Sequence, residues 1–145
     1  CKVIRVTGSA LNVGNVDYGD IYDVLYEDID IELDEDCQLS ILQREENQPL
    51  PALSEKGAFL PPVFELQLFK HHEYSVGDRR GKVHDITFRD ICITSPREIN
   101  SLIYCTAGTI ADITFENIML NGKKLISVEQ LHFPSLENTE NFHIK

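Results

Sequence analysis

The feature that most constrains the fold is an eleven-residue pattern that occurs three times along the chain. The copies are 21–31 (IYDVLYEDIDI), 83–93 (VHDITFRDICI) and 110–120 (IADITFENIML). Each follows the form apolar-x-Asp-apolar-x-aromatic-charged-Asp/Asn-Ile-x-apolar. The second and third copies start 27 residues apart, a plausible length for one coil of a solenoid, in which each repeat buries its apolar face against its neighbours. The pattern therefore predicts a repeat architecture.

Within each copy, apolar residues alternate with polar ones, which is typical of a strand. In the first copy, Val24 and Tyr26 predict one short strand, and Ile29 and Ile31 predict another. Asp28 lies between them, and an Asp at a bend tolerates left-handed backbone angles. Two short strands that meet at such a bend, once per coil, predict an all-β parallel β-helix. No segment keeps a 3.6-residue period over three turns, which disfavours a helical solenoid.

Further strands and two excursions complete the expected coils. We predict strands over 38–43, 63–69, 102–105 and 142–144. The segment 44–62 holds four prolines and is predicted to be an inserted surface loop, because proline cannot donate to a strand ladder. The segment 71–81 is predicted to be a second excursion. Each is either a plain connector or a loop that contacts a substrate.

The repeat also predicts which side chains lie inside. These are the apolar residues of the second and third copies, Ile86, Phe88, Ile91, Ile113, Phe115 and Ile118. Tyr26, Phe88 and Phe115 share one position of the repeat and are expected to stack in the core rather than to form an exposed sugar platform. Asp28, Asp90 and Asn117 share another and are expected to be bend residues, with a calcium site as the alternative.

Composition excludes several classes of function. The net charge of −11, from 24 acidic and 13 basic residues, argues against binding to nucleic acid. No apolar run reaches the roughly 18 residues of a membrane span. We expect no signal peptide, and both a secreted and a cytoplasmic location remain open. Adjacent residues of a strand point to opposite faces, so His71 and His72 would chelate one ion poorly, and we expect no metal site and no cofactor.

The repeated Asp-Ile-Thr-Phe-(Glu/Arg)-(Asn/Asp)-Ile element resembles the right-handed parallel β-helix of the pectin-lyase-like superfamily. The order of elements is most similar to the C-terminal portion of glycoside hydrolase family 28, the polygalacturonase-like enzymes. In that family an Arg-Ile-Lys substrate motif precedes a Val-x-Asn-Ile-x-Tyr-Glu-Asn-Ile strand, as 4–7 (IRVT) precedes 21–31 here. The family's Pro-Ile-x-Ile-x-Gln-x-Tyr element is similar to 39–45, and its Cys-ending strand and following Asn-Ile element are similar to 102–105 and 112–118.

The resemblance implies one substrate residue and leaves the catalytic residues unknown. Arg5 matches the arginine of the substrate motif, whereas Thr7 replaces its lysine and Glu45 replaces the tyrosine of the next motif. A uronate carboxylate is best held by paired cations, so these changes favour a neutral or different glycan. The family's Asn-Thr-Asp, Asp-Asp and Gly-His-Gly motifs are absent, and in the family order they would precede Cys1.

We therefore predict a single domain, 1–145, of about five right-handed coils that is a fragment of a longer β-helix. Its predicted function is to supply scaffold and part of the groove of a glycoside hydrolase acting on a polysaccharide or oligosaccharide. The isolated chain is expected to be inactive. The alternative is a non-catalytic β-helix module for glycan binding or assembly. Because the strand that starts at Cys1 has no polar cap before it, we also expect a homodimer through Cys1–Val6 and Ile21–Tyr26.

Overall fold

The computed structural model describes residues 1–4, 9–15, 18–34, 61–70 and 75–145. This part of the chain is all-β with parallel sheets, as predicted, and the only helical element in it is a short 3-10 turn. The elements are β1 (Lys2–Ile4), β2 (Leu11–Asn15), β3 (Ile21–Glu32), β4 (Pro62–Leu68), β5 (Lys82–Thr94), β6 (Asn100–Cys105), β7 (Thr109–Leu120), β8 (Lys123–Lys124), η1 (Val128–Leu131) and β9 (Thr139–Ile144).

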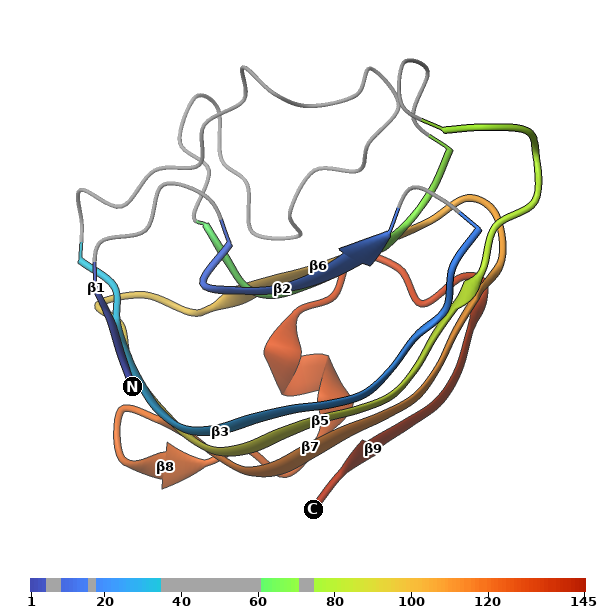
Figure 1. Cartoon of the computed structure of the whole chain (residues 1–145). Helices are drawn as coiled ribbons and strands as arrows, with labels where there is room; N and C mark the ends of the chain where they lie inside the picture. Colours follow the sequence, from blue (N-terminus) through green and yellow to red (C-terminus); the bar gives the residue numbers. More distant parts are fainter. Residues whose placement is uncertain (5–8, 16–17, 35–60, 71–74) are drawn as a thin grey trace.

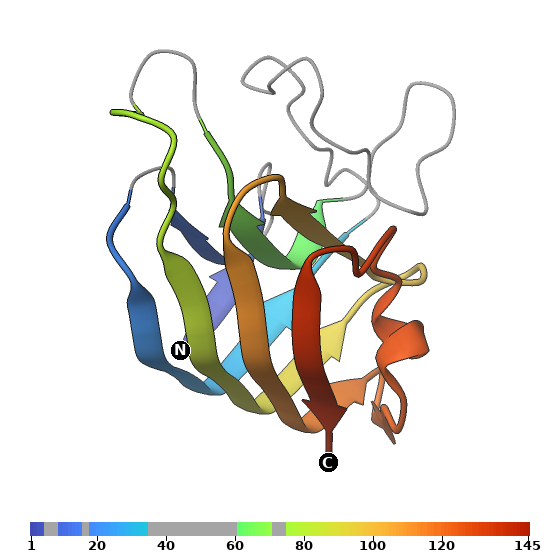
Figure 2. The same cartoon turned by 90° about the vertical axis from the view of Figure 1, so that its right-hand side faces the viewer.

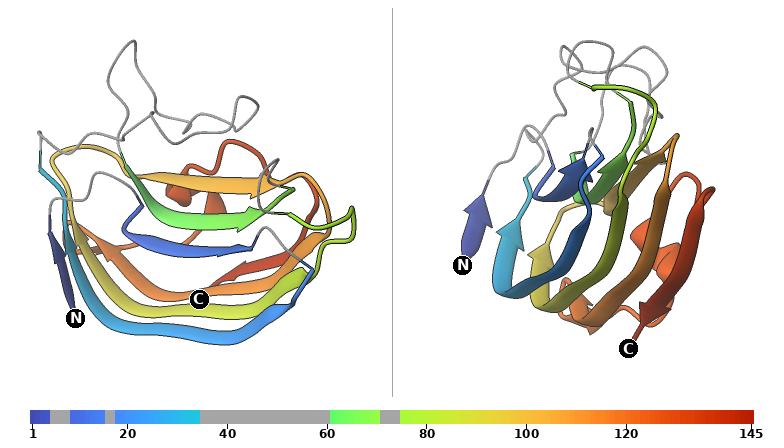
Figure 3. Two further views of the ribbon diagram at one scale, coloured as in Figure 1. Left: turned by 45° about the horizontal axis from the view of Figure 1, so that its top comes forward. Right: turned by 45° about the vertical axis from the view of Figure 1, so that its right-hand side comes forward.

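The strands form two sheets, and the chain alternates between them (Figure 1). The larger sheet has the order β1-β3-β5-β7-β8, with β9 also paired to β7. The smaller sheet has the order β2-β4-β6. All neighbours are parallel except β7 and β8, and the three sequence repeats form β3, β5 and β7. Figures 2 and 3 show β3, β5, β7 and β9 side by side, with a similar curve.

The three repeats pair in exact sequence register. Tyr26 pairs with Phe88 and Phe88 with Phe115, as equivalent positions of the pattern. Equivalent side chains consequently lie above one another, and their inward-facing rows form the core. All six residues predicted to be inside are fully buried, so this prediction is confirmed.

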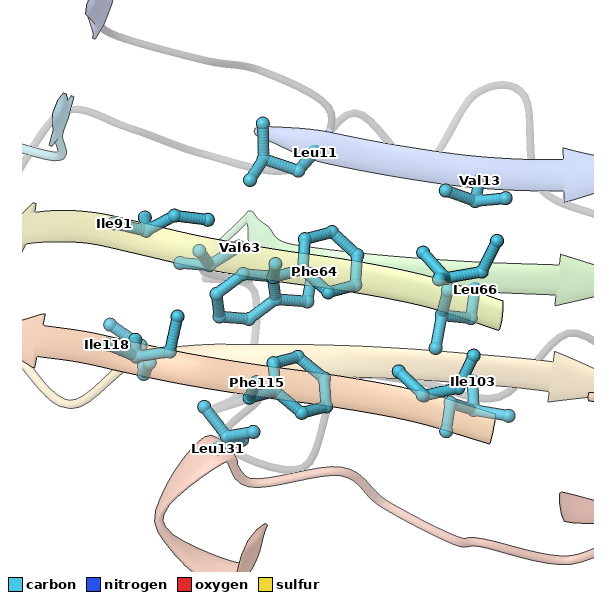
Figure 4. Close-up of a cluster of buried hydrophobic side chains, with 14 of the residues drawn as sticks. Leu11, Val13, Val63, Phe64, Leu66, Ile91, Ile103, Phe115, Ile118 and Leu131 are labelled. Carbon is cyan, nitrogen blue, oxygen red and sulfur yellow. The ribbon is translucent and has the colours of Figure 1, made fainter. Parts of the chain in front are cut away.

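The core is a layer of aromatic and branched side chains between the two sheets (Figure 4). The rings of Tyr26, Phe88 and Phe115 stack at centroid separations of 5.2 Å, which confirms the interior column. From the smaller sheet, the ring of Phe64 meets the rings of Phe88 and Phe115 edge-on at 4.9 and 5.1 Å. Edge-to-face contact is favourable because ring edges are positive and ring faces are negative.

Each long strand bends twice, whereas the sequence predicted one bend. Asp28, Asp90 and Asn117 have φ of 55°, 51° and 53°, which confirms the predicted bend residues. The second, unpredicted row lies five residues earlier and has φ of 55° at Asp23, 53° at Asp85 and 54° at Asp112. Asp and Asn adopt this left-handed region more readily than most residues, because their short polar side chains can bond locally. Each repeat therefore contains three straight segments.

Successive passes of the chain approach one another closely at glycines before the long strands. A Cβ on Gly81 would lie 2.0 Å from the carbonyl oxygen of Gly19, and one on Gly108 would lie 2.6 Å from that of Gly81. Gly108 also has φ of +92°, which disfavours any other residue. Backbone therefore packs on backbone between successive turns.

The remaining strand predictions are confirmed with shifted ends. The segment predicted at 63–69 is β4, which starts at Pro62, so Pro62 does not belong to the predicted loop 44–62. A proline is compatible with the first position of a strand, where its missing donor is tolerated. The segments predicted at 102–105 and 142–144 are β6 and β9. The predicted strand at 38–43 lies outside the described residues.

The two ends of the stack differ in how the core is covered. At the C-terminal end, Leu131 of η1 is fully buried, and Phe133 packs 6.0 Å from Phe115. At the other end, Val24 and Tyr26 are only half-buried, although their counterparts in β5 and β7 are fully buried. Among the described residues, β1 pairs with β3 only through Asp30, Ile31 and Glu32. No described strand pairs with the first part of β3 on this side.

Candidate functional site

A groove of about 520 Å³ crosses the outer face of the larger sheet. Side chains alternate between the two faces of a strand, so residues between the core positions point outward. The groove combines carboxylates, hydroxyls, an arginine and a histidine contributed by four neighbouring strands. Its lining is Asp23, Val24, Leu25, Asp85, Thr87, Arg89, Asp112, Thr114 and His143.

The carboxylates of the groove form the second bend row. Asp23, Asp85 and Asp112 come from the same position of β3, β5 and β7. In β9 the row continues with Asn141, whose side-chain amide donates a 2.9 Å hydrogen bond to Asp112 Oδ1. The same backbone bend that shapes each long strand thus presents an acidic or amide side chain to solvent.

Another row of outward-facing side chains lies two residues further along each strand than the aspartate row. Leu25, Thr87, Thr114 and His143 are register partners on β3, β5, β7 and β9. Leu25 is 50% exposed, and His143 is exposed as well. The groove floor consequently changes from apolar at β3, through two hydroxyls, to an imidazole at β9.

Arg89 is held between two glutamates of the neighbouring strands. Its Nη1 lies 2.9 Å from Glu27 Oε1 and its Nε lies 3.1 Å from Glu116 Oε2. The hydrogen bonds to Glu27 and Glu116 raise the pKa of the guanidinium above its ordinary value. All three side chains are about 40% exposed, so the arrangement is a surface ion-pair ladder that crosses three strands.

An aromatic pair made of an exposed tyrosine and a half-buried histidine flanks the groove. Tyr22 and His84 are register partners whose rings stack at 5.4 Å with an interplanar angle of 11°. Tyr22 is 57% exposed. His84 Nδ1 lies 2.6 Å from Asp85 Oδ2, which connects the pair directly to the aspartate row of the groove.

The row formed by Asp28, Asp90 and Asn117 lies beyond the ion-pair ladder. Asn117 Nδ2 donates a 2.6 Å hydrogen bond to Asp90 Oδ1. An amide that donates to its neighbour stabilises stacked bends without a cation. Within the described ranges, no group of three His, Cys, Asp or Glu side chains is arranged to hold a metal ion.

Several predicted positions lie outside the described residues. These include Arg5, the residue implied to bind substrate, together with His71, His72 and residues 44–60 of the predicted loop. The part of the second excursion that is described, 75–81, lies outside any strand. In this part of the chain, no helix has the length and apolar character required to cross a membrane.

The outer-face groove was not predicted from the sequence. The Asp at the third position of the repeat is part of the pattern, but the pattern mainly indicates which residues belong to the core. Comparison of the chain with protein-family models, curated proteins and solved structures finds no match.

Proposed function

We propose that this chain is a segment of a right-handed parallel β-helix and the C-terminal part of a polygalacturonase-like glycoside hydrolase, where it binds saccharide. The single observation that carries the proposal is the in-register stacking of three repeats that resemble the family's Asn-Ile element. The alternation of the chain between two parallel sheets supports it, because a β-helix returns to each sheet once per coil.

The outer-face groove supports saccharide binding in particular. Sugar hydroxyls both donate and accept hydrogen bonds, and the groove offers carboxylates as acceptors and threonine hydroxyls in both roles. The groove is open and runs across the strands, as suits an extended chain of sugars. Loops and surfaces on a rigid scaffold commonly carry such binding functions.

A neutral glycan is the favoured ligand class. The chain carries a net charge of −11, and three aspartates line the groove, so a polyuronate would meet like charges. The replacement of the family's lysine by Thr7 and tyrosine by Glu45 favours the same class. We therefore expect neutral polysaccharides to bind more tightly than polygalacturonate.

Catalysis is not assigned to this chain. Glycosidases of the inverting type use an acid and a base on opposite sides of the scissile bond, with room for a water between them. The groove aspartates instead come from equivalent bends and lie in one row on one face. We expect the isolated chain to release no reducing sugar.

An assembly module is the second candidate, and the edge of β3 favours it. Among the described residues, Ile21–Glu27 pair with β5 on one side, whereas β1 pairs with β3 at Asp30–Glu32. A strand edge with half-buried core residues can pair with another chain. Assembly through this edge does not require the outer-face groove.

Affinity electrophoresis and a reducing-sugar assay test the proposal. The chain is run through gels that contain neutral galactan, arabinan or glucan, or polygalacturonate. Retarded mobility in a neutral gel, without sugar release, is the expected result. Unchanged mobility in every gel would contradict saccharide binding, and sugar release above a mock preparation would contradict the absence of catalysis.

A further inference from the structure

We infer that the outer face of the larger sheet is a site for a neutral oligosaccharide, which stacks on the Tyr22–His84 pair and extends into the groove, and that the pairing of Arg89 excludes uronates. The inference rests on the proposed saccharide-binding function and assigns it a location and a selectivity. It concerns a face that the resemblance to polygalacturonases does not assign to substrate.

The aromatic pair provides the apolar part of the site. The faces of aromatic rings carry partial negative charge and attract the C–H groups of a sugar ring. Tyr22 is 57% exposed although its ring already stacks on His84, so a large aromatic surface stays in contact with water. Because the two rings stack nearly parallel, at 11°, one face of Tyr22 lies against His84, and the exposed aromatic surface belongs mainly to the rest of the Tyr22 ring.

Hydrogen-bonding groups lie next to the platform. Asp85 contacts His84 through its Oδ2 atom and also lines the groove, so the platform and the groove share a carboxylate. Asp23 occupies the equivalent position on β3, adjacent to Tyr22. Thr87 follows on the same face as His84. A sugar ring on the platform would therefore meet acceptors along one of its edges.

Charge selects the class of sugar. Among the residues that line the groove, the basic side chains are Arg89 and His143. Glu27 and Glu116 both bind Arg89 already. A uronate that bound there would have to displace one of these carboxylates and lie near the aspartate row. In the ion-pair ladder, Arg89 thus links neighbouring strands and does not serve as a binding site for a ligand carboxylate.

The first test removes the platform. Binding of neutral galacto-, arabino- and gluco-oligosaccharides is measured by titration calorimetry with the full chain and with Tyr22→Ala. We expect Tyr22→Ala to weaken binding about fivefold, within the range of one aromatic contact. Ile126→Ala is the control, because Ile126 is 77% exposed and lies on the C-terminal segment, and it should bind as the parent chain does. Thermal melts establish that both variants fold.

The second test removes the two ionic partners of Arg89. In Glu27→Gln/Glu116→Gln the guanidinium loses both ionic partners, so we expect affinity for oligogalacturonate to rise at least about tenfold. Glu98→Gln/Glu137→Gln changes the net charge equally at exposed positions outside the groove and should not increase this affinity.

The outcomes separate the two levels of the proposal. If no neutral oligosaccharide binds the parent chain, both the proposed function and this inference fail. If neutral sugars bind but Tyr22→Ala binds them equally well, the saccharide function stands and the location is wrong. If both double variants gain the same affinity for oligogalacturonate, the selectivity assigned to Arg89 is wrong.

Discussion

Truncating Phe115 of the aromatic column, as Phe115→Ala, should destabilise the fold strongly. The Phe115 side chain is fully buried. It stacks on Phe88 at 5.2 Å, meets Phe64 edge-on at 5.1 Å, and lies 6.0 and 6.3 Å from Phe133 and Phe142. The variant therefore removes contacts with four rings at once and leaves a cavity between the two sheets.

The expected cost can be estimated from this environment. Replacing a buried phenylalanine by alanine typically costs about 3–5 kcal/mol. Aromatic pairs add about 0.5–1.5 kcal/mol beyond the area that they bury, so the upper part of that range applies. For a chain of this size, about 4 kcal/mol corresponds to a fall in melting temperature of about 8–16 °C.

Urea unfolding and thermal melts followed by circular dichroism provide the assay. Phe142→Ala is the matched control, because Phe142 has the same chemistry but is only half-buried at the end of the column. Removing the Phe142 ring should lower the free energy of unfolding by about 1 kcal/mol, which is less than the roughly 1.5–3 kcal/mol expected for a fully buried side chain. Equal melting temperatures for Phe115→Ala and the parent chain would refute the assignment of Phe115 to the core.

Three further predictions concern the glycine contacts, the buried thiol and the edge of β3. Gly81→Ala should lower the free energy of unfolding in urea by at least about 1–3 kcal/mol, because its Cβ would collide with the Gly19 backbone. Gly19→Ala is the control and should be tolerated, because no atom lies within 4 Å of its Cβ. Equal losses of stability in the two variants would contradict the close approach. Burial raises the pKa of the Cys105 thiol, so mass spectrometry should find it alkylated more slowly at pH 8 than the exposed Cys92, and equal rates would argue against its burial. Light scattering should give twice the 16.5 kDa chain mass, and Val3→Lys should reduce it; a monomer mass for the parent chain would count against association through the β3 edge.

The core was predictable from the sequence because the repeat fixes it. Residues at the same position of three copies must lie in the same environment if the copies stack, so Ile86 and Ile113, or Phe88 and Phe115, could be assigned together. Asp28, Asp90 and Asn117 were likewise recognised as bend residues from the composition of one position.

The second bend and the groove were harder to predict. Asp23, Asp85 and Asp112 interrupt a run that otherwise alternates as one strand, and a single Asp in such a run does not distinguish a bend from an exposed strand position. The role of Arg89 depends on Glu27 and Glu116, which are 62 and 27 residues away from it. Such a ladder becomes visible only once the register of the three strands is known.

The most direct test of the proposed fold and site is a crystal structure of the chain grown with a neutral oligosaccharide that the binding assays select. We expect a parallel β-helix with sugar density against the rings of Tyr22 and His84 and along the aspartate row of the larger sheet. Sugar bound on the outer face of the smaller sheet would contradict the proposed site, and strands that do not coil in one direction would contradict the proposed fold.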